Sequence, residues 1–272
     1  MPVLWLKVAV GFYAFGLIYS LAGFRRPAAL ISRIVVPLMA AGGIFHFVSL
    51  VEGFALGTGG VMLTSVRDSV SILAFLMLTA FLIAYAKYRT PSPGIFIFPP
   101  VFLLSLATAL SRQPVTFASP LIRNGWLAVH IALIFAGYAA LFLSFAASLL
   151  YLFQERALKS KHPSGVAARL PSLQMVDEIG YRALLFGFPF MTLGLIAGSV
   201  VAQTSYGPGY FTDPKVLLSL AMWAVYMVLL YTRWNSGWRG RRAAYLASFG
   251  VITALSAWIA NYFSGIHRLV AP

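Results

Sequence analysis

The histidines are the residues of this chain best suited to chemistry, because an imidazole ring can bind a metal ion or carry a proton near neutral pH. The chain has only four of them, and it has no cysteine that could act as a nucleophile or a thiolate ligand. His46, His130 and His267 lie in or directly beside strongly apolar stretches, whereas His162 lies in a polar one. We interpret His162 as a solvated loop residue and treat the other three as candidate ligands.

The composition indicates what kind of element must position these side chains. Of the 272 residues, 60% are hydrophobic and 10% are charged, whereas a soluble domain carries roughly 25% charged residues. The net charge of +14 does not indicate a nucleic-acid-binding protein, because the basic residues punctuate apolar runs and form no separate basic domain. We therefore expect an integral membrane protein that does not bind nucleic acid.

A helix that spans a membrane needs ~20 mostly apolar residues. The sequence has eight apolar runs that are candidates for such spans. They cover residues 3–23, 31–53, 67–86, 94–111, 125–153, 181–203, 215–233 and 244–263, and the fifth is the longest. Positive charges follow the first run instead of preceding it, so we expect an uncleaved helix and not a signal peptide. The predicted fold class is all-α, a polytopic membrane protein of about eight transmembrane helices that forms one domain over residues 1–272.

The loops between these runs predict the orientation. If the N-terminus is outside, fourteen of the 20 Lys and Arg residues fall on the inner side, where such residues are normally enriched. We therefore expect both termini on the outer, periplasmic side of a bacterial inner membrane, with a basic inner rim that contacts anionic lipid. The basic residues left on the outer side are Lys7, Arg67, Arg112, Arg123, Lys215 and Arg268.

This topology gathers three histidines, from three separate helices, at the outer face. His46 falls in the outer half of the second run, His130 in the first turns of the fifth, and His267 just beyond the eighth. A single such ring often only rests at the headgroup level, but ionisable groups at this depth are functional candidates. Zinc sites usually add carboxylate or thiolate ligands, and the outer acidic residues show no zinc-binding spacing. Haem iron fits better, because it takes axial imidazoles from separate elements.

Aromatic and cationic side chains on the outer side also suit a haem. A segment shaped by Gly and Pro, residues 206–215, joins the sixth and seventh runs. The residues that would line a porphyrin or pair with its propionates are Trp126, Tyr206, Tyr210, Phe211, Arg67 and Arg123. The simpler interpretation of the aromatic residues is an interfacial belt.

Four stretches of the chain, in the same order, resemble the cytochrome c assembly family of the CcsA and HemX type, whose members handle haem in membranes. They begin at residues 45, 126, 206 and 261 and read FHFVSLVEGF, WLAVHIALIF, YGPGYFTDPK and NYFSGIHRLV. The resemblance implies that His130 and His267 are the paired external ligands of a haem b, with His46 a further histidine near the site. It also implies that residues 206–215, which include Asp213, cover the haem.

The chain departs from the family pattern in two ways. Tyr206, Tyr210 and Phe211 stand where tryptophans are expected, and Tyr231 replaces a membrane histidine that belongs to an inner haem site in members that export haem. By resemblance, the chain holds or presents haem at the outer face for attachment to apocytochrome c, together with a separate assembly partner. As an enzyme it would be at most one part of a cytochrome c haem-lyase complex. The alternatives are a HemX-like regulatory or assembly subunit without haem ligation, and a small-anion transporter.

Overall fold

Eight α-helices and one short 3₁₀-helix make up the part of the chain that the structure, a computed structural model, describes. The described residues are 2–22, 28–56, 66–111, 125–159, 170–260 and 263–264. The helices are α1 (Pro2–Ala22), α2 (Ala28–Leu56), α3 (Val66–Tyr88), α4 (Gly94–Leu110), α5 (Gly125–Lys159), α6 (Leu173–Tyr206), η4 (Gly207–Thr212), α7 (Pro214–Asn235) and α8 (Arg241–Ile259). The predicted all-α fold class is confirmed for these residues.

Seven of the described helices are long and apolar enough to cross a membrane, which confirms a polytopic membrane protein. The helix α4 occupies the fourth predicted span but has only 17 residues. At ~1.5 Å per residue it is roughly 25 Å long, against a hydrocarbon core of about 30 Å. Pro99 and Pro100 lie inside α4, and the helix continues through them although each proline lacks a backbone donor. The eight expected helices are therefore present, and one of them is short.

The long helices α5 and α6, of 35 and 34 residues, form the middle of the bundle. The sequence predicted that the fifth span is the longest, but it ended this span at residue 153 and began the sixth at residue 181. The helices instead end at Lys159 and begin at Leu173. Ser172 caps this start, because its side-chain oxygen accepts a hydrogen bond from the backbone N–H of Met175 at 3.2 Å. The polar residues before the apolar run therefore extend the helix instead of forming a loop.

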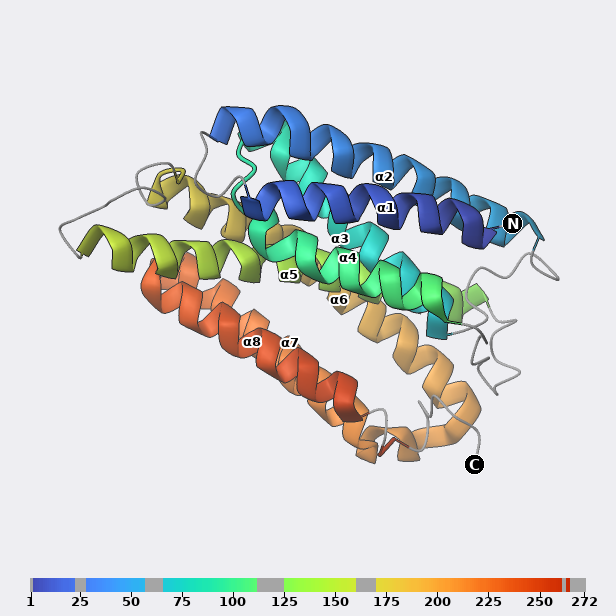
Figure 1. The fold of residues 1–272 in the computed structure, drawn as a ribbon. Coiled ribbons are helices and arrows are strands. Elements are labelled where there is room, and N and C mark those ends of the chain that lie inside the picture. The colour runs from blue at the N-terminus through green and yellow to red at the C-terminus, as the bar shows by residue number, and fades with distance from the viewer. Residues whose placement is uncertain are drawn as a thin grey trace.

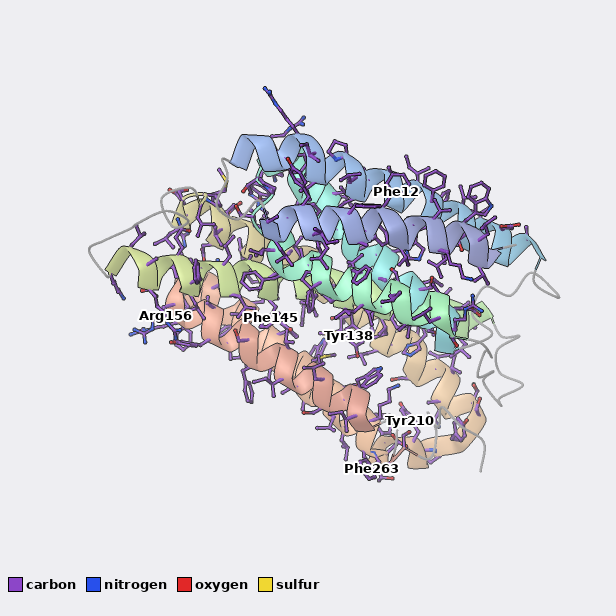
Figure 2. The ribbon with its side chains drawn as sticks, viewed as in Figure 1. Phe12, Tyr138, Phe145, Arg156, Tyr210 and Phe263 are labelled. Atoms are coloured by element: carbon purple, nitrogen blue, oxygen red, sulfur yellow. The ribbon has the colours of Figure 1, made fainter. Side chains whose placement is uncertain are left out.

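Successive helices run antiparallel, so the bundle has two ends (Figure 1). The η4 end carries η4, the starts of α1, α3, α5 and α7, and the ends of the even-numbered α-helices. In Figure 1, α1 to α4 pack on one side, α7 and α8 lie together on the other, and α5 and α6 join the two groups. Figure 2 places Tyr210 and Phe263 at the η4 end and Arg156 at the opposite end. The start of α1 and the end of α8 thus share one end of the bundle.

Glycines allow neighbouring helices of the bundle to approach closely. A Cβ atom added to Gly194 of α6 would lie 2.8 Å from the side chain of Ile134 in α5. Between α1 and α2, a Cβ atom added to Gly42 would lie 2.5 Å from the ring of Tyr13. Both distances are shorter than the ~3.5–4.0 Å of carbon atoms in contact, so only glycine fits at these two crossings without movement of a neighbour.

Charged residues hold together the end opposite η4, which we call the Arg233 end. Arg233 Nη2 lies 2.7 Å from Asp177 Oδ2, and the two side chains are only 10% and 18% exposed. Asp177 Oδ1 also accepts a hydrogen bond from the backbone N–H of Gly240 at 3.0 Å, where the chain turns with a φ of 63°. The guanidinium lies over the ring of Tyr181, 4.7 Å from its centroid. These contacts tie the start of α6 to the end of α7 and to the turn before α8.

Candidate functional site

His130 lies in the second turn of α5, at the η4 end, and its half-buried ring packs against the backbone of α6. Its Nδ1 atom lies 2.6 Å from the carbonyl oxygen of Gly194. Because a carbonyl oxygen can only accept a hydrogen bond, Nδ1 must carry a proton and donate it. In a neutral ring the lone pair is then on Nε2. Nε2 is therefore the ring atom that can bind a metal ion.

Two glycines of α6, one helical turn apart, make this packing possible. Gly194 supplies the carbonyl oxygen. Gly198 leaves room for the ring, because a Cβ atom there would lie 2.6 Å from both Cε1 and Nδ1 of His130. The two glycines therefore let the imidazole ring pack directly against the backbone of α6.

The end of α6 and the η4 helix that follows it expose two aromatic side chains, Tyr206 and Phe211, and bury a third, Tyr210. Tyr210 is 4% exposed, and its ring centroid lies 4.1 Å from that of Phe211. Tyr206 and Phe211 are 44% and 52% exposed. Of the three aromatic residues predicted for the site in residues 206–215, two therefore present an accessible ring, whereas Tyr210 packs inward.

Asp213 follows η4, and both of its carboxylate oxygens accept hydrogen bonds within the protein. Its Oδ1 atom accepts from the backbone N–H of Lys215 at 2.9 Å and so caps the start of α7. Its Oδ2 atom accepts from the hydroxyl of Ser264, 51 residues along the chain, at 2.8 Å. Asp213 is 7% exposed and Ser264 is fully buried. This predicted site residue is therefore an internal acceptor that joins two distant segments.

Lys215 lies half-buried in the first turn of α7, two residues after Asp213. The carboxylate of Asp213 therefore holds both the backbone of Lys215 and the side chain of Ser264.

His46 lies fully buried among α1, α2 and α3, with both ring nitrogens engaged. Its Nδ1 lies 3.2 Å from the hydroxyl of Tyr13 and its Nε2 lies 2.9 Å from the hydroxyl of Ser71. The ring of Phe75 meets it edge-on, with centroids 5.6 Å apart. These neighbours come from α1 and α3, whereas those of His130 come from α6, so the structure does not bring the two histidines together.

The remaining predicted residues divide into described and undescribed ones. Trp126 lies one helical turn before His130 in α5 and is 56% exposed. Arg67 is half-buried at the start of α3. His267 and Arg123, like the loop residue His162, lie outside the described residues.

The sequence interpretation missed two contributors, Gly198 and Ser264. Gly198 had a local signal, since it follows Gly194 at the four-residue spacing of a close helix contact, but its partner was not identifiable. Ser264 had no local signal, because its partner Asp213 is 51 residues away in the chain.

Comparison with known proteins identifies a family that this chain resembles along most of its length. The profile of a family described as cytochrome c assembly protein matches residues 8–269. Several similar proteins are named cytochrome c biogenesis protein CcsA. The one from Guillardia theta is 28% identical over 229 residues, covering 76% of this chain and 75% of the relative. One from Prochlorococcus marinus (strain MIT 9303) is 30% identical over 239 residues, covering 77% and 75%. One from Prochlorococcus marinus subsp. pastoris is 27% identical over 268 residues, covering 89% and 83%.

Proposed function

This chain belongs to the cytochrome c assembly protein family, and we propose on that premise that it binds haem at the η4 end of the bundle during cytochrome c biogenesis. Its relatives carry the name cytochrome c biogenesis protein. The η4 end is the outer side of the membrane in this proposal, because most basic residues of the chain fall in the loops of the Arg233 end. The membrane is the inner membrane of a bacterium.

The seat of His130 is the observation that carries the proposal. Histidines that bind metals usually donate their second ring N–H to a carbonyl or carboxylate, which fixes the tautomer and makes the other nitrogen more basic. The hydrogen bond from Nδ1 of His130 to Gly194 has this form. An imidazole held in this way on an apolar helix suits the axial position of a haem iron.

His267 is the second axial ligand in this proposal. It comes three residues after Ser264, and three residues of chain reach at most about 11 Å. Ser264 donates to Asp213, which caps α7 at the η4 end, and the start of α5 with His130 lies at this same end of the bundle. Ser264, the last described residue before His267, is thus held at the end of the bundle that carries the first ligand.

The exposed aromatic rings and the cations of the η4 end complete the proposed site. Trp126, Tyr206 and Phe211 are large, accessible rings, and such rings stack on a porphyrin face. Lys215, Arg67 and Arg123 would pair with the propionates as charged hydrogen-bond donors.

The chain's own residues hold and orient the haem; they supply no covalent chemistry of attachment. With no cysteine in the sequence, the thiols that receive the haem must come from apocytochrome c. The bound haem b is the group that is transferred, and the chain presents it to a separate assembly partner as one part of a haem-lyase complex. His130 and His267 would hold the haem at the outer end of the bundle, where a soluble acceptor could reach it.

One observation favours the alternative of a HemX-like regulatory or assembly subunit. Tyr231 stands where the family resemblance leads one to expect an inner histidine, and its ring is 59% exposed on α7. Its hydroxyl accepts a hydrogen bond from Asn235, one turn further along the same helix. An inner haem site built on this position would lack the expected imidazole ligand.

The absorption spectrum of the detergent-purified protein, oxidised and then dithionite-reduced, tests the proposal. We expect the low-spin spectrum of a bis-histidine haem, lost in His130→Ala and in His267→Ala and kept in His162→Ala. Equal haem retention in all three variants would refute the ligand assignment. A wild-type protein that takes up no haem, even when haem is added, would refute haem binding and favour the regulatory subunit.

A further inference from the structure

We propose that the end of α5 and the start of α8 form a binding site for the headgroup phosphate of an anionic phospholipid, at the Arg233 end of the bundle. Three exposed arginines of these two helices, Arg156, Arg241 and Arg242, would hold the phosphate. The site does not depend on haem. It differs from the diffuse attraction between a basic rim and anionic lipid, because defined side chains from two helices make it.

The end of α5 and the start of α8 pack against each other. Gly240, the residue before α8, lies so close to the Tyr151 hydroxyl of α5 that a Cβ atom there would overlap it. Arg241 and Arg242 are the first two residues of α8, and Arg156 follows Tyr151 on α5 by little more than one helical turn. Figure 2 shows Arg156 beside the start of α8. The three arginines therefore lie at one corner of the bundle.

Two of the arginines rest on aromatic rings. The guanidinium of Arg241 lies over the ring of Tyr245, 5.4 Å from its centroid, and its Nε and Nη2 atoms donate to the Tyr245 hydroxyl at 3.4 and 3.3 Å. The guanidinium of Arg242 lies over the ring of Trp238 at 5.8 Å. A guanidinium on a ring keeps N–H donors at its edge, in a fork that fits a phosphate. Such contacts order both side chains in part before a ligand binds, which lowers the entropy cost of binding.

No carboxylate of the described residues forms an ion pair with these three arginines. The ion pairs that the described residues do form join Lys159 to Glu155, Arg182 to Glu178 and Arg233 to Asp177. The first turn of α8 also has no acidic residue. Three like charges at one corner repel one another. An anion that accepts hydrogen bonds from them would therefore stabilise the folded protein.

The apolar surface next to the arginines favours a phospholipid over a free anion. Tyr245, Phe249 and Ile252 are exposed, and their spacing of four and three residues puts them on one face of α8. Phe153, one turn before Arg156 on α5, is exposed as well. Because α8 is apolar enough to cross a membrane, this face can lie along acyl chains while its arginines and aromatic residues lie at headgroup level.

The first measurement is the unfolding temperature of the detergent-purified protein with added phosphatidylglycerol, phosphatidylcholine or inorganic phosphate. We expect phosphatidylglycerol to raise it by several degrees, and the other two to change it little. Arg241→Gln and Arg242→Gln should each lose most of the rise. Arg239→Gln is the matched control and should keep it, because it removes one exposed charge from the same segment but none of the three arginines. Equal losses in Arg239→Gln and Arg241→Gln would overturn the site and leave only diffuse attraction. An equal rise with inorganic phosphate would overturn the phospholipid as the ligand.

The second measurement counts bound lipid directly, by native mass spectrometry of the protein released from its detergent. We expect one phosphatidylglycerol to stay bound to the wild type at an activation energy that removes phosphatidylcholine. Arg241→Lys keeps the charge but loses the planar fork, so it should retain several-fold less phosphatidylglycerol, as Arg156→Gln should. Equal retention of the two lipids by the wild type, or equal retention of phosphatidylglycerol by the wild type and these variants, would overturn the proposal.

Discussion

Replacing Gly198 by alanine tests the seat of His130 directly. The new Cβ atom would lie 2.6 Å from Cε1 and Nδ1 of the imidazole, about 1 Å inside the usual contact distance. If the ring moves away by that ~1 Å, its hydrogen bond to Gly194 lengthens from 2.6 Å to beyond the ~3.2 Å limit of a good hydrogen bond. The ring then loses the contact that fixes its tautomer and its direction.

The expected magnitude follows from the loss of that hydrogen bond. Removing the partner that orients a metal-binding histidine typically weakens metal affinity by ~10–100-fold. The helix itself should not suffer, because alanine stabilises a helix interior by roughly 0.5–1 kcal/mol relative to glycine. We therefore expect Gly198→Ala to bind haem ~10–100-fold more weakly while it folds as well as the wild type.

The assay is a haem titration of purified apoprotein, followed by absorbance, with a thermal unfolding curve on the same sample. Gly180→Ala is the matched control, because it lies on the same α5–α6 contact and its Cβ atom would meet Ala147 at an ordinary 3.4 Å. It should leave haem affinity unchanged. Wild-type affinity and spectrum in Gly198→Ala, in a protein whose His130→Ala variant loses haem, would refute the reasoning.

Two further substitutions separate structural residues from residues of the site. His46→Ala should lower the free energy of unfolding by about 1–3 kcal/mol, because it leaves the hydroxyls of Tyr13 and Ser71 without their imidazole partner. The variant should keep the haem spectrum. Loss of haem with unchanged thermal stability would instead make His46 a ligand. Arg233→Met should cost about 3 kcal/mol, measured by thermal unfolding in detergent, since it leaves the Asp177 carboxylate partly buried without its cation. Adding Asp177→Leu to Arg233→Met should restore part of that stability. Arg182→Met is the control: it breaks only the exposed pair with Glu178 and should change the unfolding temperature little. Equal effects of Arg233→Met and Arg182→Met would contradict this account.

The helices could be predicted from the sequence because a membrane span is defined by length and apolarity, and both are local properties. The start of α6 was placed too late for the same reason. Its first turns carry Asp177 and Glu178, which interrupt the apolar run, and the helix continues through them because Ser172 caps it and Arg233 pairs with Asp177. Helical turns made of polar residues and stabilised by a partner far away in the sequence cannot be recognised from the length of an apolar run.

The contacts of the histidines could not be predicted, because helices that are apolar all round carry no periodic signal for which face meets a neighbour. The sequence placed His46 and His130 in the same half of the bundle, and the structure agrees. It could not indicate that His46 turns toward Tyr13 and Ser71, away from His130. The roles of His130 and His267 as haem ligands stay predictions until the spectra are measured.

The shortness of α4 has a consequence for the lipid around the protein. At ~25 Å it falls about 5 Å short of the hydrocarbon core, and Leu103 and Leu110 lie exposed on its outward face. A short span is accommodated by thinning of the bilayer, by snorkelling of flanking residues or by association. We expect thinning beside α4 and none beside α5, which has 35 residues. Hydrophobic mismatch costs fractions of a kcal/mol per Å, enough to give the bundle a preference for shorter acyl chains along one side. The protein would then be surrounded by an annulus of uneven thickness, thinnest beside α4.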